Sequence, residues 1–279
     1  MIWSKIIIDV LPDEQDLLVA DLVEWGATAF EEEEGTLTLW LDENGDRQGL
    51  ENLLGEWESK RGALTWRVEP VEDQNWNRQW EESIQPLEIG PFFIHPTWSS
   101  AAVPDGRIEI TIDPKMAFGT GYHETTHLIL SWLPDMASGS VENLLDAGTG
   151  TGLLAIAALK LGVQHAIGFD IDPWSVRNAQ ENRVLNDVEA FFEVFEGDEH
   201  VIPEGIKFDR VVANINRNVL TDMIPALVAR TREGGMLLLS GLLDRDESWM
   251  REALEREGQQ VAEIRRRGEW IALRIDVVR

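Results

Sequence analysis

Two histidines in the stretch HETTH, residues 123–127, have the spacing of a zinc site. His123 and His127 are four residues apart, so on a helix they would share one face and could hold a single Zn²⁺. Glu124 between them could then act as the general base for hydrolysis of a peptide bond. The pattern therefore raises the hypothesis of a zinc metalloprotease.

The rest of the sequence does not complete such a site, because catalytic zinc requires a third protein ligand. Three other histidines are present and none belongs to a ligand motif: His95, His165 and His200. Glu142 lies at a downstream distance that some metalloproteases use, but it directly precedes a strand leading into a glycine loop. Gly121 places His123 near the start of a helix rather than within it. We expect no metal, and the zinc protease stays an alternative.

A second stretch, LLDAGTGTGLLAIA, has the composition of a nucleotide-binding loop. Its glycines, Gly148, Gly150 and Gly152, follow a buried strand and precede a helix, where glycine permits a tight turn and close ligand approach. The dinucleotide fingerprint is G-x-G-x-x-G, whereas here the third glycine comes one residue early. With Asp146 before it, the loop resembles the D-x-G-x-G-x-G loop of S-adenosylmethionine-dependent methyltransferases. A plain glycine turn is the alternative.

Polar residues stand at the ends of the strands that follow this loop. Asp170 ends HAIGFDI about 20 residues further on, where a carboxylate can accept hydrogen bonds from both ribose hydroxyls. Asp172 precedes Pro173 and is expected to cap the next helix. Asp198 either reaches an adenine edge or closes a turn. Asn214 ends the strand in FDRVVANI, so its amide is expected at the carboxyl edge of the sheet, where open α/β folds bind ligands.

Two domains and a linker are expected to position these residues. Residues 1–68 have the order β-α-β-β-α-β of a small α+β, ferredoxin-like domain. Residues 69–100, rich in Trp and Pro, are expected to form an extended linker. In the domain over 101–279, strands alternate with helices, which predicts an α/β fold with a parallel, doubly wound sheet. The last two strands have no helix between them and are expected to form an antiparallel hairpin.

The composition excludes several classes of protein. There are 51 acidic residues against 24 Lys and Arg, a net charge of −27. Direct nucleic-acid binding is not expected, because neutralising phosphates requires basic clusters. The acids are spread along the whole chain, which favours adaptation to a high-salt cytoplasm over attraction to a basic partner. Because we find no membrane-spanning apolar run, no secretory signal and no Cys, we expect a cytoplasmic protein.

Several stretches resemble, in order and spacing, the ribosomal protein L11 methyltransferases. They are PLEIGPFFIHPTW, AFGTGYHETTHLIL, DAGTGTGLLAIAALKLG, GFDIDP, ANI and LLLSGLL. The resemblance implies a ferredoxin-like substrate-recognition domain joined to a class I methyltransferase domain. It also implies transfer of methyl groups from S-adenosylmethionine to lysine side chains, and in some members to the α-amino group, of a basic large-subunit ribosomal protein.

The resemblance further implies which residues contact the cofactor. They are Thr126 of the HxTT element, Gly148 and Gly150 of the loop, Asp170, Asn214, and Phe118 lining the same pocket. Two positions depart from the family, since Asn216 and Arg217 follow ANI where small or apolar residues are frequent.

Methyl transfer from a sulfonium is a direct displacement, so the main requirement is alignment of the reacting atoms. A lysine amine, with a reference pKa of about 10.4, must first lose a proton. A low-dielectric pocket beside the sulfonium favours that loss. We assign the catalytic role to Asn214, which together with backbone carbonyls orients the amine while water takes the proton.

Two further hypotheses stay open beside the zinc protease. A class I methyltransferase with another substrate, RNA or another protein, has the same sequence signals. Relatives that modify protein glutamine carry Asn-Pro-Pro-Tyr after the fourth strand, whereas this chain has ANINRN. A noncatalytic module that binds a nucleoside is the second. The enzyme is expected to be a monomer.

Overall fold

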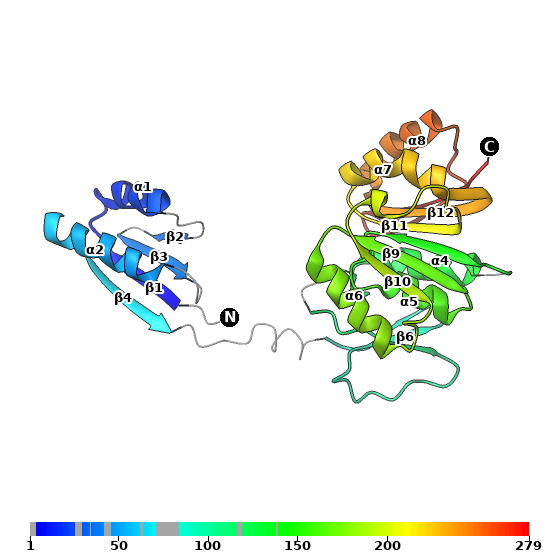
Figure 1. Cartoon of the computed structure of the whole chain (residues 1–279), viewed down its shortest axis with the longest axis horizontal. Helices are drawn as coiled ribbons and strands as arrows, with labels where there is room; N and C mark the ends of the chain where they lie inside the picture. The colour runs from blue at the N-terminus through cyan, green and yellow to red at the C-terminus, as the bar shows by residue number, and fades with distance from the viewer. Residues whose placement is uncertain are drawn as a thin grey trace. The chain divides into compact units, whose positions relative to one another are not determined.

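The structure, a computed structural model, describes residues 4–25, 30–33, 35–41, 46–61, 64–70, 84–115, 119–137 and 139–278. Phe118 and residues 71–83 of the expected linker lie outside these ranges. The chain divides into two compact units, Met1–Glu82 and Ser83–Arg279 (Figure 1). Within the described ranges, no helix combines the length and apolar character needed to cross a bilayer.

The first unit is a four-stranded antiparallel sheet with two helices. Its elements are β1 (Ser4–Asp9), α1 (Gln15–Trp25), β2 (Phe30–Glu33), β3 (Thr36–Leu41), α2 (Arg47–Arg61) and β4 (Thr65–Pro70). The strand order is β2-β3-β1-β4, and all three neighbouring pairs are antiparallel. This order, with a helix after β1 and after β3, confirms the expected ferredoxin-like fold.

One apolar core holds the first unit together. Ile6 and Ile8 alternate along β1 and so point to the same face of the sheet. There they join buried leucines of both helices, including Leu18 of α1 and Leu50 of α2, in a single cluster. Each helix therefore buries one stripe against the same side of the sheet.

The second unit contains the remaining elements. They are β5 (Leu87–Ile89), β6 (Phe92–His95), β7 (Ile108–Thr111), α4 (Glu124–Met136), β8 (Asn143–Ala147), α5 (Leu153–Lys160), β9 (His165–Asp170), α6 (Pro173–Leu185), β10 (Phe192–Glu196), the 3-10 helix η1 (Glu199–Val201), β11 (Phe208–Asn214), α7 (Arg217–Arg230), β12 (Thr231–Leu243), the 3-10 helix η2 (Asp244–Asp246), α8 (Glu247–Arg256), β13 (Glu263–Arg267) and β14 (Trp270–Asp276).

A seven-stranded sheet with the order β10-β9-β8-β11-β12-β14-β13 forms the centre of this unit. The strands from β10 to β12 are parallel, whereas β14 runs antiparallel to both of its neighbours. The doubly wound sheet and its C-terminal antiparallel hairpin are therefore confirmed. Since the order reverses at β8, the carboxyl ends of β8 and β11 lie at a topological switch point, where such folds bind ligands.

Alternating residues of these strands enter two separate cores. Leu144 of β8 and Val212 of β11 belong to a cluster with α4 and α5. Their neighbours Leu145 and Val211 belong to a second cluster with α7 and α8. The sheet is thus covered by helices on both faces (Figure 1). Burial on both faces explains why its strands are continuous apolar runs in the sequence.

Part of the segment expected to be a linker is folded into the second unit. Strands β5, β6 and β7 form a small sheet of their own, with β5 antiparallel and β7 parallel to β6. Phe92 and Ile94 of β6 and Ile110 of β7 are buried in the same cluster as α4 and α5. The linker was expected over 69–100, and its described part from residue 84 onward contains β5 and β6, whose apolar residues complete a core.

Candidate functional site

The predicted site residues gather at the carboxyl edge of the seven-stranded sheet. Gly148 and Gly150 follow β8, Asp170 ends β9 and Asn214 ends β11, and these three strands are adjacent. Thr126 lies in the first turn of α4. A small cavity is lined by Gly148, Gly150, Thr126 and Asn214 together, and a larger cleft beside it is lined by Gly148 and Asp170. Phe118 is not among the described residues.

The glycine loop is held close to two neighbouring strands. The backbone N–H groups of Gly148 and Thr149 both donate to the carbonyl of Phe169 at the end of β9, at 2.9 and 3.0 Å. Gly148 has a φ of +68°, and a Cβ there would lie 2.4 Å from Cγ2 of Ile215. Only glycine tolerates both the positive φ and the lack of space for a Cβ, so the backbone of the loop can approach a ligand closely.

Asp170 is oriented by the backbone around it. Its Oδ2 accepts a hydrogen bond from Gly150 N at 2.9 Å, and its Oδ1 accepts one from Asp172 N at 3.0 Å. Asp172 in turn caps α6 by accepting from Trp174 N and Ser175 N, as predicted. Each carboxylate oxygen can accept two hydrogen bonds, so Asp170 retains capacity for two more donors, such as adjacent hydroxyls.

Asp146 lies in β8, and its carboxylate bonds the first turn of α5. Its Oδ2 accepts from Thr149 Oγ1 at 2.8 Å and from Ala155 N at 3.2 Å. Complete burial raises the pKa of this carboxyl to about 7, an effect that the Thr149 hydroxyl opposes and the nearby Asp170 increases. Because Asp146 already bonds the helix N-terminus, this loop differs from one that presents free N–H groups to a phosphate.

The larger cleft is acidic and encloses about 840 Å³, part of it open to solvent. Its lining residues are Gly148, Phe169, Asp170, Ile171, Asp198, Glu199, Ile215, Asn216, Val219, Asp222 and Met223. Four of these carry carboxyl groups, and none of these described residues is Lys, Arg or His. Such a lining disfavours the pyrophosphate of a dinucleotide and favours a ligand with hydroxyl groups or positive charge.

Asn214 lines both the small cavity and a second cavity, which we call the far cavity. It is only 9 % exposed, and its Nδ2 donates to Thr126 Oγ1 at 3.3 Å. Its Oδ1 is buried and has no hydrogen-bond partner among the described residues. The far cavity is lined by His123, Thr125, Asn214, Ile215, Asn216, Gly241 and Trp270. The acceptor capacity of Asn214 Oδ1 is thus unused within the described part of the molecule.

The histidines of HETTH are arranged differently from those of a zinc protease. His123 is not inside α4 but is its N-cap, with extended backbone, and its Nδ1 accepts from Thr125 N at 3.3 Å. Its ring contacts that of Trp270 edge-to-face, with the centroids 4.6 Å apart. His127 lies within the helix, where burial, and then Arg267, lower its pKa. The two imidazoles therefore do not form the intrahelical pair that the zinc motif requires.

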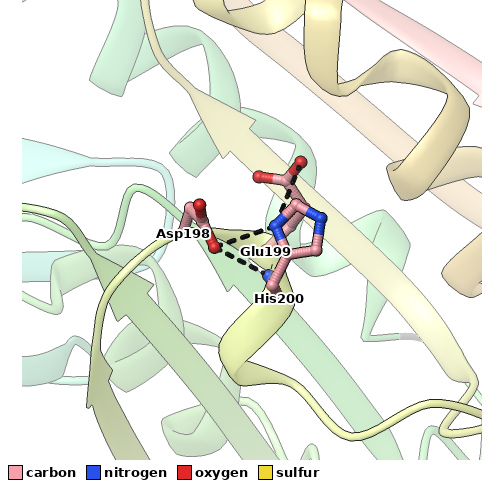
Figure 2. Close-up of side chains that lie close together, drawn as sticks. All are labelled: Asp198, Glu199 and His200. Carbon is pink, nitrogen blue, oxygen red and sulfur yellow. Dashed lines mark hydrogen bonds and ion pairs between the residues drawn. The ribbon is translucent and has the colours of Figure 1, made fainter.

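Asp198, at the rim of the cleft, belongs to a small polar cluster (Figure 2). One of its carboxylate oxygens, Oδ1, lies 3.0 Å from both the backbone N and the ring Nδ1 of His200. Nδ1 of His200 is also 3.9 Å from Oε1 of Glu199. Asp198 is the N-cap of η1, so these contacts belong to a capped turn. The structure therefore confirms the turn aspartate, while contact of Asp198 with an adenine edge stays a prediction.

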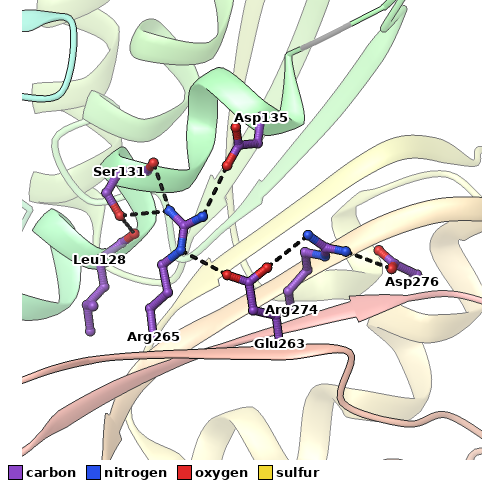
Figure 3. A network of polar contacts seen from close by, with 7 residues as sticks. All are labelled: Leu128, Ser131, Asp135, Glu263, Arg265, Arg274 and Asp276. Atoms are coloured by element: carbon purple, nitrogen blue, oxygen red, sulfur yellow. Dashed lines mark hydrogen bonds and ion pairs between the residues drawn. The ribbon is translucent and has the colours of Figure 1, made fainter.

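A polar network fixes α4 against the C-terminal hairpin (Figure 3). Arg265 of β13 donates to the carbonyl of Ser131, and its guanidinium pairs with Asp135 at 3.1 Å and with Glu263 at 3.2 Å. The same guanidinium stacks on Trp132, 4.4 Å from the ring centroid. Because α4 carries Thr126 in its first turn, the hairpin helps to place the walls of both cavities.

Sequence reasoning did not find the far cavity. Trp270 is the first residue of β14. The antiparallel pairing of β14 with β12 aligns Trp270 with Leu243 and so brings it to the carboxyl edge of the sheet. Gly241 also has a strict conformational requirement, since a Cβ there would lie 2.3 Å from the carbonyl oxygen of Ile215. No local sequence signal marks either residue, because both roles depend on tertiary structure.

The strand order, the reversed β14 and the glycine loop after the first parallel strand define a class I methyltransferase fold. Comparison with known proteins identifies the family. The sequence matches the family "Ribosomal protein L11 methyltransferase (PrmA)" over residues 9–277. This chain therefore belongs to the ribosomal protein L11 methyltransferase family.

Individual relatives agree with that assignment. A ribosomal protein L11 methyltransferase of Porphyromonas gingivalis is 40 % identical over 268 residues, covering 93 % of this chain and 89 % of the relative. One from Chlorobaculum tepidum is 35 % identical over 273 residues, with 95 % and 93 % covered. The crystal structure of a ribosomal protein L11 methylase from Lactobacillus delbrueckii subsp. bulgaricus has a TM-score of 0.65 at 30 % identity, covering 70 % of this chain and 100 % of that chain.

Proposed function

We propose that this protein transfers methyl groups from S-adenosylmethionine to amino groups, chiefly of lysine, on ribosomal protein L11. Membership of the L11 methyltransferase family supports this function. The observation that carries it is that Asn214 lines both the small cavity, which shares Gly148 with the acidic cleft, and the far cavity. A donor and an acceptor in these two cavities could thus meet at Asn214, as a direct displacement requires.

The acidic cleft and the small cavity are the proposed site of the methyl donor. S-adenosylmethionine supplies an electrophilic methyl group on a sulfonium and has ribose hydroxyls but no phosphate. Asp170 would accept from the hydroxyls, since both of its oxygens are already held in place by backbone N–H groups. Thr126, Gly148 and Gly150 would surround the rest of the ligand. Phe118 stays a proposed contact on the family resemblance alone.

The far cavity is the proposed entrance for the amine. Trp270 and His123 give it an aromatic wall, suited to the methylene groups of a lysine side chain. Oδ1 of Asn214, which has no partner among the described residues, would accept a hydrogen bond from the amine N–H and orient the nitrogen lone pair toward the donor. The far cavity opens to solvent, so water can take the proton, and no dedicated base is assigned.

The remaining parts of the proposal concern the partner. We assign residues 1–68 to substrate recognition, 69–100 to a connection and 101–279 to catalysis, following the family resemblance. The net charge of −27 suits a basic ribosomal protein. A cytoplasmic monomer that does not bind nucleic acid directly is proposed. Another protein or an RNA as the methyl acceptor is the second candidate.

Incubation with labelled S-adenosylmethionine separates these acceptors. Purified L11, L11 with its amines acetylated, ribosomal RNA and protein-free buffer are each offered to the enzyme. The proposal predicts label in unmodified L11 only, with its intact mass rising in steps of one methyl group. Label in the RNA, or equal labelling of acetylated L11, would overturn the assigned acceptor while leaving the methyltransferase activity intact. A lack of transfer to any acceptor would favour a binding module without activity.

A further inference from the structure

Helix α6 carries three buried asparagines one turn apart, Asn178, Asn182 and Asn186, which we call the asparagine ladder. None is more than 3 % exposed. Asparagine is a poor helix former, and a buried amide is costly unless it is hydrogen-bonded. Spacing of four residues places all three on one face of the helix. Such a row therefore requires partners on the element that it faces.

The partners are mostly backbone groups of β7 and the residues just after it. Asn186 exchanges two hydrogen bonds with Thr111, at 3.0 and 2.7 Å. Asn182 Oδ1 accepts from Asp113 N at 3.0 Å, and Asn178 Nδ2 donates to the Asp113 carbonyl at 2.8 Å. β7 is the edge of its small sheet, so the ladder takes the place of a neighbouring strand.

Asn182 has an additional partner that its neighbours lack. Its Nδ2 also donates to the carbonyl of Thr151, in the glycine loop, at 2.9 Å. The Thr151 hydroxyl in turn donates to the carbonyl of Gly119 at 2.7 Å, and Thr151 is fully buried. Two side chains thus tie three segments together: α6, the glycine loop and the stretch that leads into α4.

This tie lies directly behind the small cavity. Gly119 and Gly150 both line that cavity; Thr151 follows Gly150 in the chain and is hydrogen-bonded to Gly119. Thr151 and Asn182 are not among its lining residues. The Thr151–Gly119 hydrogen bond therefore fixes the distance between two walls without itself contacting a ligand in the cavity.

We propose that Thr151 and Asn182 are positioning residues that set the spacing between the glycine loop and the Gly119 segment, and hence the affinity for the methyl donor. The inference rests on the proposed binding of S-adenosylmethionine. Its physical basis is preorganisation, because walls held apart at the right distance lose less freedom when a ligand binds. Asn186 is similarly buried and is the C-cap of the same helix, but it has no hydrogen bond to the loop among the described residues, so it should not have this effect.

Calorimetric titration with S-adenosylhomocysteine, an unreactive probe, measures the affinity of the Thr151 and Asn182 variants. Urea unfolding measures the stability of each variant in parallel. The isosteric Thr151→Val removes the hydroxyl and should weaken binding about five- to ten-fold, as expected for one lost hydrogen bond. Thr151→Ser keeps the hydroxyl and should restore affinity to within about two-fold. Asn182→Ser should weaken binding like Thr151→Val.

The matched control is Asn186→Ser, which should lower stability as much as Asn182→Ser but bind the probe like the native protein. Native affinity in Thr151→Val, or equal weakening in Asn186→Ser and Asn182→Ser, would overturn the positioning role. If the native protein itself did not bind the probe, the proposed function would fail first, and this inference with it.

Discussion

Asn214 lines two cavities, and its buried amide oxygen has no hydrogen-bond partner among the described residues. Leaving a buried acceptor unsatisfied costs about 1–3 kcal/mol, so such an atom in a folded protein calls for a role. Contact with an incoming amine would supply the missing donor. The position of the Asn214 side chain would thus explain both the cost in stability and the proposed orientation of the amine.

Asn214→Ala should lower kcat by roughly 100-fold, because an oriented hydrogen-bond acceptor at the reacting nitrogen is lost. The affinity for S-adenosylhomocysteine should change much less. Asn218→Ala is the control, since Asn218 is exposed and bonds only Arg217 among the described side chains. Steady-state rates with L11 across a pH range give the comparison. Unchanged turnover in the Asn214 variant would remove this residue from the mechanism.

Asp146 makes stability depend on pH in an unusual direction. Its pKa is raised from 3.8 to about 7 by burial. Between these values the unfolded chain ionises the carboxyl while the folded protein keeps its proton. Its contribution to the free energy of unfolding therefore falls as the pH rises, and levels off above about 7. The raised pKa sets an upper limit of about 4 kcal/mol on this loss.

Asp146→Asn does not titrate, so urea unfolding of native protein and variant between about pH 5.5 and 8 isolates the effect. The native protein should lose stability relative to the variant as the pH rises through this range. Other carboxyl groups titrate equally in both proteins and cancel. A stability difference that is constant with pH would show that Asp146 is ionised throughout, contrary to its burial.

At the residue scale, local signals predicted the residues whose roles are local. Gly148 follows from the turn it forms, Asp172 from the cap before Pro173, and Asp170 from its place at a strand end. Trp270 and Thr151 were not predicted as site residues, because their partners lie far away in the sequence. Their contacts exist only once β14 pairs with β12 and the glycine loop approaches Gly119.

At the scale of elements, α4 is the element that both cavities share. Its N-terminal residues line them, and its last two turns are held by Arg265 of the hairpin. Sequence periodicity predicted α4 and the hairpin separately, but not the network between them. The alternation of strands with helices likewise predicted the parallel, doubly wound sheet. It missed the small sheet of β5 to β7, whose strands are too short to show a clear period.

Arg265→Lys should lower the free energy of unfolding by about 1 kcal/mol, because lysine lacks the planar fork that bonds Ser131 and stacks on Trp132. Arg266→Lys, on the same strand, is the matched control. Its partners Asp244 and Glu247 form surface ion pairs, and the expected change is under about 0.5 kcal/mol. Urea denaturation at neutral pH measures both. Equal losses would mean that the network contributes no more than surface pairing.

At the scale of the whole molecule, the excess of acid acts on both stability and association. A net charge of −27 repels itself in the folded state, and salt screens that repulsion. The charge is counted directly from the sequence, but the count alone does not show what the charge does. Adaptation to high salt and attraction to a basic partner would both produce an excess of acidic residues.

Raising the NaCl concentration should therefore increase the urea midpoint of unfolding. If the acids also steer the basic substrate, kcat/KM for L11 should fall roughly ten-fold or more over the same range, because steering weakens with ionic strength. Adaptation alone predicts the stability increase without the loss of kcat/KM. A urea midpoint that falls with salt would contradict the self-repulsion argument.

The most direct test of the central claim is a crystal structure of the protein with S-adenosylhomocysteine. We predict the ribose hydroxyls on the Asp170 carboxylate, the nucleoside in the acidic cleft and the sulfur directed at Asn214 from the side of the small cavity. The cavity of His123 and Trp270 should stay open for the amine. A nucleoside bound against Trp270, or a ligand that leaves Asp170 without contact, would contradict it.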